Sequence, residues 1–297
     1  MRDVTETWKA FVRQRKQVWI CCFVHICLYV IALGLGFWRQ PVLAAAIGGA
    51  NVILYFLLVR GQITGYKTAV TSAAILNGLC EPLEDAKYTG RKGLDRQEFE
   101  ALGLFPLFDG PNSLLVREGF SGMGFDLELK GWEVSFHYPV HNSARTEYRF
   151  MSGSVLTAGR PAAPNENGDW LIVRKGLLDA AALDSFTGEM GLSRSACPIG
   201  PIASEFDCYS PGGSPVPREL AKRFEKCLKQ AGSLGAVRVK PRQAAVYLVN
   251  RFYARRVRLR NLPPSPQQLN CNTLPERDGV WEFFRLWFAA ENKSDEH

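Results

Sequence analysis

The chain has 297 residues, 46% of them hydrophobic, and a net charge of +7. Its eight cysteines show no pairable spacing and no Cys-x-x-Cys motif, which argues against a disulfide framework and a structural zinc site and favours a reducing compartment. No catalytic or cofactor motif stands out, so the sequence predicts location and architecture more than activity.

The first sixty residues contain two apolar runs, 18–38 and 42–59, separated only by Arg39, Gln40 and Pro41. A helix needs about 20 residues to cross about 30 Å of hydrocarbon, so each run is long enough to span a bilayer once. The sequence therefore predicts a transmembrane hairpin behind a basic tail at 1–17. A cleaved signal peptide is the alternative, but the first run exceeds the usual ~7 to 15 residues of a signal core.

Positive charge predicts the orientation of this hairpin. The tail carries five basic residues, whereas the turn between the runs carries only Arg39. Because basic flanks stay in the cytoplasm, the tail and everything after the second span should be cytoplasmic, with both termini on that side.

Two polar residues, His25 and Asn51, lie within the predicted spans. Polar side chains are costly in hydrocarbon, so each should have a partner. At about 1.5 Å per residue both lie roughly 10 to 12 Å from the cytoplasmic face, which predicts an interhelical hydrogen bond between them. A haem or proton-relay role for His25 is the alternative, but it lacks a second ligand or an acidic chain.

The remaining chain predicts an α+β domain at 89–297 on a stalk helix at 64–88. Apolar residues recur every three to four positions from Thr64, and the period changes to two after Phe120. The buried parity reverses at Lys130 and Gly131, which predicts a tight hairpin turn there. Further strands are expected at 147–150, 170–173, 236–240 and 244–248, and helices at 217–229 and 280–291. A mainly antiparallel meander with flanking helices is the simplest arrangement.

Three short motifs resemble an uncharacterised bacterial membrane-protein family, domain of unknown function three-one-three-seven. They are Gly103-Leu104-Phe105 with Asp109-Gly110, Tyr148-Arg149-Phe150-Met151-Ser152-Gly153, and Phe206-Asp207-Cys208-Tyr209-Ser210. The resemblance implies a multi-pass protein of the bacterial inner membrane with a cytosolic domain, and it transfers no catalytic residue. Members commonly follow the last motif with an acidic and aromatic stretch, whereas this chain has Pro211-Gly212-Gly213-Ser214-Pro215, so it resembles a divergent member.

Charge is unevenly distributed along the chain, because residues 218–260 alone sum to +11 and residues 64–217 sum to −6. Within the basic segment, Arg238 and Lys240 alternate with valines, and Arg256, Arg258 and Arg260 alternate with Val257 and Leu259. If these two stretches are paired strands, the five cations form one face that suits anionic lipid headgroups or an acidic protein.

We therefore expect a non-enzymatic interaction module tethered to the lipid bilayer, with no cofactor and no metal. Pairing of these arginines with the acidic middle segment is one alternative, and nucleic-acid binding is another. A hydrolase-type enzyme with an unrecognised site is the third, and its candidate residues would be Asp126, Glu128, Glu133, His137 and His141.

Overall fold

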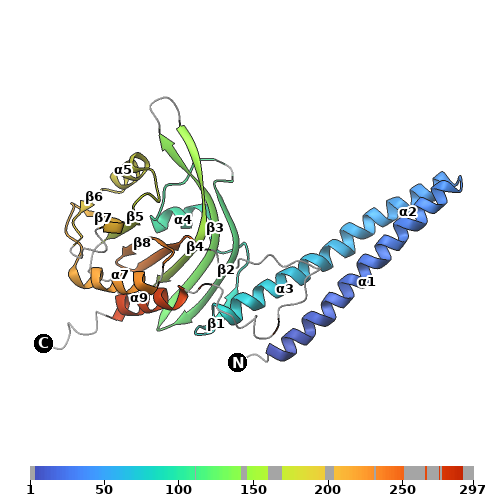
Figure 1. The fold of residues 1–297 in the computed structure, drawn as a ribbon, viewed down its shortest axis with the longest axis horizontal. Coiled ribbons are helices and arrows are strands. Elements are labelled where there is room, and N and C mark those ends of the chain that lie inside the picture. Colours follow the sequence, from blue (N-terminus) through green and yellow to red (C-terminus); the bar gives the residue numbers. More distant parts are fainter. Residues whose placement is uncertain are drawn as a thin grey trace. The chain divides into compact units, whose positions relative to one another are not determined.

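The computed structural model describes residues 4–110, 112–141, 146–159, 169–197, 204–230, 232–250, 265, 274 and 276–289. The chain divides into two compact units, one that includes Met1–Gly78 and one that includes Leu79–Ala254. Figure 1 shows the first as a helical hairpin and the second as a curved sheet with helices. The fold is α+β, as the sequence predicts.

The helical unit consists of α1 (Val4–Phe37), α2 (Pro41–Leu54), the π-helix η1 (Tyr55–Val59) and α3 (Arg60–Gly78). Two continuous helical stretches, Glu6–Phe37 and Pro41–Gly78, are long and apolar enough to cross a membrane. Pro41 occupies the first turn of α2, where its missing N–H leaves no hydrogen bond unmade.

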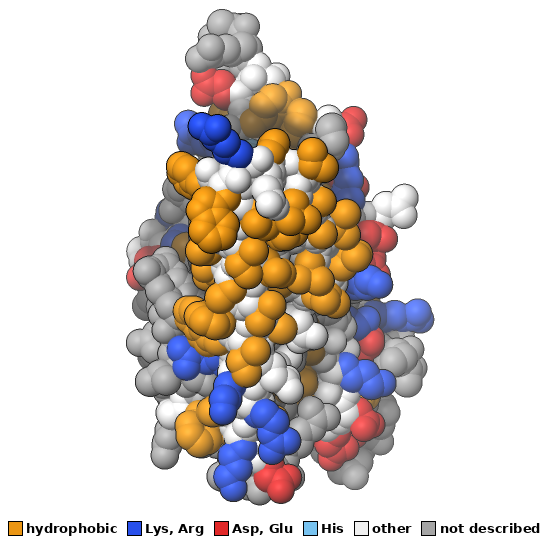
Figure 2. Space-filling view, turned by 90° about the vertical axis from the view of Figure 1, so that its right-hand side faces the viewer, with side chains coloured by type: hydrophobic (Ala, Val, Ile, Leu, Met, Phe, Trp, Pro, Cys, Tyr) orange, Lys and Arg blue, Asp and Glu red, His pale blue; other side chains and the backbone are white. Residues whose placement is uncertain are grey.

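A seven-residue repeat forms the seam of α1. Phe11, Val18 and Ala32 are buried, and His25 occupies the fourth position of the repeat. A spacing of seven keeps side chains on one face of a helix, toward the antiparallel partner. Outside this seam, apolar side chains point away from the hairpin: Phe23 is 66% exposed, and hydrophobic side chains gather over the centre of Figure 2.

The predicted stalk helix is ten residues too long. The helix ends at Gly78, and Glu84–Tyr88 forms the strand β1 instead. Gly78 and Pro82 interrupt the helix, since glycine weakens a helix interior and proline breaks one.

The second unit is built on a nine-stranded sheet in which every pair of neighbours is antiparallel. Its order is β1-β2-β3-β4-β9-β8-β5-β7-β6. The other strands are β2 (Leu114–Gly124), β3 (Leu127–His141), β4 (Thr146–Gly159), β5 (Trp170–Arg174), β6 (Leu192–Ser195), β7 (Phe206–Pro211), β8 (Leu234–Lys240) and β9 (Gln243–Leu248). The meander expected from the sequence holds for β1 to β4 and then breaks, because β9 and β8 lie between β4 and β5.

The predicted turn at Lys130 and Gly131 is wrong. Both residues lie inside β3, and the β2–β3 turn is formed by Phe125 and Asp126, with φ of 56° and 60°. The parity of buried residues reverses within β3 because both faces of the sheet are covered. Gly131 is required there, since a Cβ at this position would lie 2.5 Å from the Phe120 ring.

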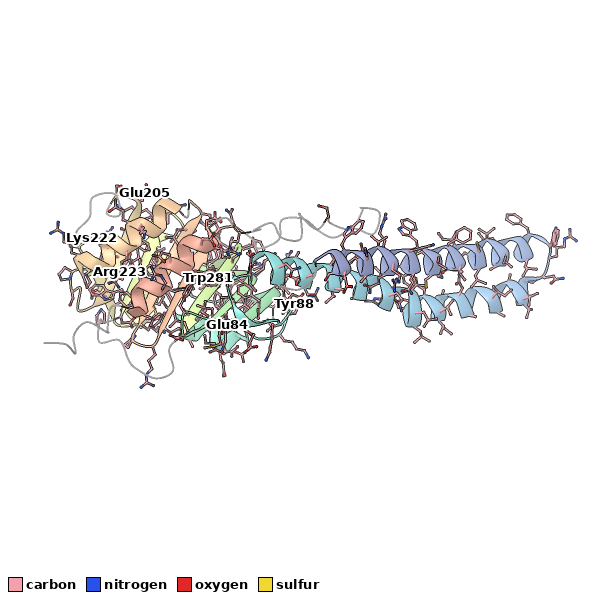
Figure 3. The ribbon with its side chains drawn as sticks, turned by 90° about the horizontal axis from the view of Figure 1, so that it is seen from below. Glu84, Tyr88, Glu205, Lys222, Arg223 and Trp281 are labelled. Carbon is pink, nitrogen blue, oxygen red and sulfur yellow. The ribbon has the colours of Figure 1, made fainter. Side chains whose placement is uncertain are left out.

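Helices cover both faces of the sheet. On one face α4 (Arg96–Leu102) and α5 (Ala180–Glu189) bury Phe99 and Leu183 against Trp132, Val134 and Tyr247. On the other face α7 (Arg218–Gln230) and α9 (Arg277–Ala289) pack side by side, and Figure 3 marks them by Arg223 and Trp281. There the Phe206 and Phe224 rings, and the Phe120 and Trp281 rings, meet edge to face.

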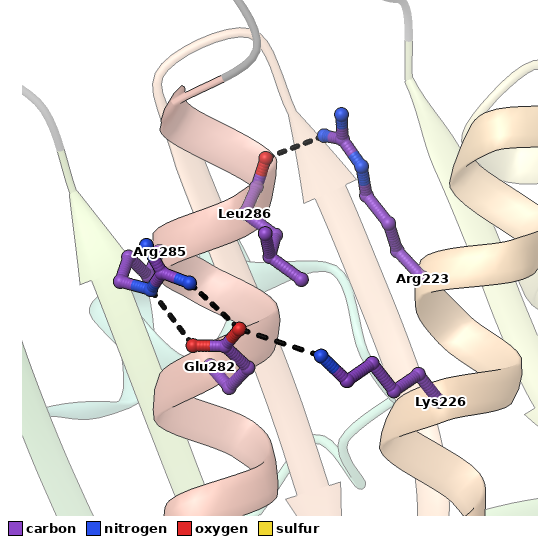
Figure 4. Close-up of polar contacts among 5 residues, drawn as sticks. All are labelled: Arg223, Lys226, Glu282, Arg285 and Leu286. Carbon is purple, nitrogen blue, oxygen red and sulfur yellow. Dashed lines mark hydrogen bonds and ion pairs between the residues drawn. The ribbon is translucent and has the colours of Figure 1, made fainter.

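Polar side chains join α7 to α9, as Figure 4 shows. Arg223 donates to the carbonyl of Leu286, and Lys226 Nζ lies 3.5 Å from Glu282 Oε1. Arg285 donates to Glu282 from Nε at 2.7 Å. This hydrogen bond, helped by the charges of Arg285 and Lys226, holds the pKa of the Glu282 carboxyl below its ordinary value.

Candidate functional site

The helical hairpin contains the polar contact that its sequence predicts. His25 Nδ1 donates to Asn51 Oδ1 at 2.7 Å, and Asn51 Nδ2 donates to the His25 carbonyl at 3.0 Å. Asn51 is fully buried. The rings of Tyr29 and Tyr55 lie 4.9 Å and 5.1 Å from the imidazole. The pair is therefore enclosed by the two helices and joins them through two hydrogen bonds.

Arg238 does not belong to an outward cationic face. Its side chain is 3% exposed and lies on the α4-covered face of β8, where Ala236 is also in the core. Nη2 donates to Asp169 Oδ2 at 2.6 Å. The sequence prediction is wrong here because alternation along a strand identifies an exposed face only when one face of the sheet is uncovered.

Lys240 is also turned toward the protein. Its Nζ donates to the carbonyl of Ala101 in the last turn of α4, a position where a cation complements the helix dipole. Burial, and then the charge of Arg238, lower the pKa of Lys240, whereas the Asp169 carboxylate acts in the opposite direction. Burial likewise lowers the pKa of Arg238 against the opposing effect of Asp169.

Gly103 brings the end of α4 against these two cations. It has a φ of 67°, and a Cβ added there would lie 3.5 Å from Lys240 Nζ and 3.6 Å from Arg238 Nε. Arg238 Nε and Nη1 and Asp169 Oδ1 are buried without a hydrogen-bond partner. Such a cluster constrains the fold more than it stabilises it, because desolvating two cations offsets their attraction to one carboxylate.

The proposed pairing of the two basic stretches does not occur. β8 pairs with β9 on one side and with β5 on the other, so both of its edges are occupied. Arg256, Arg258 and Arg260 lie outside the described residues. Any contribution they make to a basic surface must be independent of Arg238 and Lys240.

The acidic and histidine candidates do not converge. Glu128 forms an ion pair with Lys130 at 2.9 Å, and Glu133 is buried on the opposite face of β3. The His137 ring lies 5.3 Å from that of Phe150, and the side chain of His141 is outside the described residues. Within the part of the chain that the structure describes, no group of three or more His, Cys, Asp or Glu is placed to hold a metal.

A buried polar cluster at the start of α9 was not foreseen from the sequence. Glu276 Oε1 accepts hydrogen bonds from Ser233 Oγ at 2.6 Å and from Asn250 Nδ2 at 2.7 Å, and Ser154 Oγ donates to the Asn250 carbonyl. These residues are far apart in the chain, so no local motif announces them. The cluster fixes the start of α9 to the sheet and brings together the two ends of the segment 251–275.

No family model, no curated protein and no solved structure matches the chain.

Proposed function

We propose that the chain is a membrane-anchored interaction module of the bacterial inner membrane. The hairpin crosses the bilayer with both termini in the cytoplasm, and the sheet unit works at the inner leaflet without covalent chemistry. The observation that carries this proposal is the pattern of the hairpin: apolar side chains point outward while the polar His25 and Asn51 are closed inside. The resemblance to domain of unknown function three-one-three-seven adds support for the location.

The contact with the inner leaflet would be made by the segment 251–260. It contains five arginines and no acidic residue, and three of them are Arg256, Arg258 and Arg260. The inner leaflet has a surface potential of about −30 mV, and each basic residue beside it contributes about 1 kcal/mol. A domain already held at the membrane needs no high affinity for such a contact, because tethering raises the effective concentration.

Vesicle flotation tests this contact. The fragment 79–297 contains the sheet and its helices, which form a compact unit with their own core. We expect it to float with phosphatidylglycerol vesicles at low salt and not with phosphatidylcholine vesicles. The variant Arg256/Arg258/Arg260→Gln should bind about 100-fold more weakly, from three contributions of about 1 kcal/mol each.

The matched control removes the same number of charges elsewhere. Arg91, Arg218 and Arg242 are exposed in the sheet unit, and their replacement by Gln should change flotation much less. Equal losses in the two variants would reduce the contact to net charge. Absence of flotation, with retention on immobilised single-stranded RNA, would favour the nucleic-acid alternative, for which Phe252 and Tyr253 are available for base stacking.

A further inference from the structure

A groove of about 740 Å³ follows the outward face of the helix that η1 and α3 form together. Its lining residues recur at intervals of one, three and four, so they share one helix face: Phe56, Arg60, Gly61, Thr64, Gly65 and Thr68. All six are exposed, whereas Tyr66 and Val70 on the opposite face are buried. A Cβ added to Gly61 or Gly65 would meet no atom within 4 Å, so the glycines leave the backbone open to an occupant.

The groove is cationic, and its counter-charge does not come from the helical unit. Between Glu6 and Glu81 the sequence contains no Asp or Glu. The Arg60 guanidinium carbon lies 5.6 Å from the centroid of the Phe56 ring, which holds the cation at one end of the groove. An anion that binds Arg60 must therefore be supplied from outside these helices.

The position of Arg60 along the helix indicates where that anion lies. Arg39 and Arg60 are 21 residues apart, which corresponds to about 31 Å of helix and matches the ~30 Å hydrocarbon thickness of a bilayer. Lys16 precedes His25 by nine residues, and Arg60 follows Asn51 by nine. Because His25 and Asn51 are hydrogen-bonded, Lys16 and Arg60 lie at nearly the same depth, about 13 Å from the pair.

We propose that this groove binds the headgroup of an anionic phospholipid from the cytoplasmic leaflet. The guanidinium of Arg60 donates to the phosphodiester oxygens, and the hydroxyls of Thr64 and Thr68 donate to headgroup or ester oxygens. Gly61 and Gly65 allow the headgroup to approach the helix backbone, and the acyl chains lie along the apolar residues that precede Arg60. This proposal rests on the membrane anchor proposed above.

A second copy of the chain is a poorer occupant of the same groove. The pair Gly61 and Gly65 has the spacing that lets transmembrane helices approach closely. Two copies packed through this face would, however, bring Arg60 near Arg60 with no acidic residue of α1, α2 or α3 to separate them. A phosphodiester satisfies the charge that a second copy would repel.

Native mass spectrometry of the full chain tests the proposal. The protein is reconstituted into bilayers of equal phosphatidylglycerol and phosphatidylcholine, extracted gently and weighed with its retained lipids. We expect a preference for phosphatidylglycerol of about fivefold, the factor that roughly one basic residue beside an anionic surface provides. Arg60→Gln should abolish the preference by removing the cation, and Gly65→Leu should abolish it by filling the groove without changing the charge.

The matched control is Arg39→Gln, which removes one arginine from the other end of the hairpin and should keep the preference. An equal loss in Arg39→Gln and Arg60→Gln would overturn the proposal, and so would an unchanged preference in Gly65→Leu. A lipid-free dimer that Gly65→Leu dissociates would also overturn it, in favour of self-association. Leucine is a better helix former than glycine, so this variant retains the helix.

The outcome is separable from that of the flotation experiment, since the fragment 79–297 lacks the groove. Extraction of the full chain from membranes by alkaline carbonate would contradict the anchor and this site together. Resistance to carbonate without lipid preference would contradict this site alone.

Discussion

Asp169 is the acidic partner of a cation that the fold has buried. Arg238 is 3% exposed, and the Asp169 side chain is 32% exposed. Removing one partner of a buried pair leaves a charge without compensation, which costs more than the pair itself contributes. The ion pair therefore matters for stability mainly through the consequence of breaking it.

We expect Asp169→Ala to lower the free energy of unfolding of fragment 79–297 by about 2 to 3 kcal/mol, somewhat below the usual range because Asp169 is partly solvated. The double variant Asp169→Leu/Arg238→Met should lose less than Asp169→Ala alone, because no unpaired charge remains. Urea unfolding measures both values. Glu100→Ala, which removes the exposed ion pair with Arg96, is the control and should cost about 0.5 kcal/mol or less. Equal losses in Asp169→Ala and Glu100→Ala would contradict this account.

The sequence located these residues without revealing their surroundings. Arg238 and Lys240 alternate with valines, as predicted, and they do lie on a strand. Their exposure depends on α4, which is brought to that face by the chain more than 130 residues earlier. The hydrogen bond between His25 and Asn51 was foreseeable because the two helices are adjacent in sequence and joined by a short turn.

Among the elements, α7 and α9 were predicted to within a few residues, and so were β8 and β9. Their local patterns are strong because each has one period and clear ends. The insertion of β9 and β8 between β4 and β5 was not predictable, since it depends on pairing between segments far apart in the chain. The contact between α7 and α9 follows from that order.

The pH dependence of this contact follows from the lowered pKa of Glu282. A carboxyl whose pKa is lower in the folded state stabilises the fold above its ordinary value of 4.5, and this contribution is lost as pH falls through the folded-state pKa. The Tm difference between fragment 79–297 and its Glu282→Gln variant should be constant near neutral pH and disappear in acid.

The size of this effect should be about 0.5 kcal/mol, because the carboxylate is partly exposed and its ion pairs are screened. Thermal unfolding between pH 3 and 7 measures it. Glu84→Gln, which removes an exposed carboxylate of β1, is the control and should leave the acid limb of the curve unchanged. A difference that persists at pH 3 would show that Glu282→Gln acts through packing.

At the scale of the whole molecule, the proposed topology predicts opposite environments for two points of the chain. A phosphatase that is active only outside the cytoplasm should be active when it is inserted after Gln40 and inactive when it is fused after His297. A fluorescent protein that folds in the cytoplasm should give the reverse pattern. Phosphatase activity at His297 would contradict an even number of crossings and place the sheet unit on the other side of the membrane.

The π-helix η1 has a consequence for the numbering of the second long helix. In an unbroken α-helix the eight residues from Asn51 to Val59 would rotate by about 800°, which would leave Val59 about 80° from the Asn51 side. The wider turn of η1 takes up most of this angle, so Asn51 and Val59 are both buried. Deleting one residue from 55–59 would restore the regular winding and swing α3 by about 100°, so the face that now carries Arg60 and Thr64 would turn away from its present direction. A one-residue change in chain length thus acts here as a rotation of everything that follows, and a comparison of sequences across this helix must count residues as well as match them.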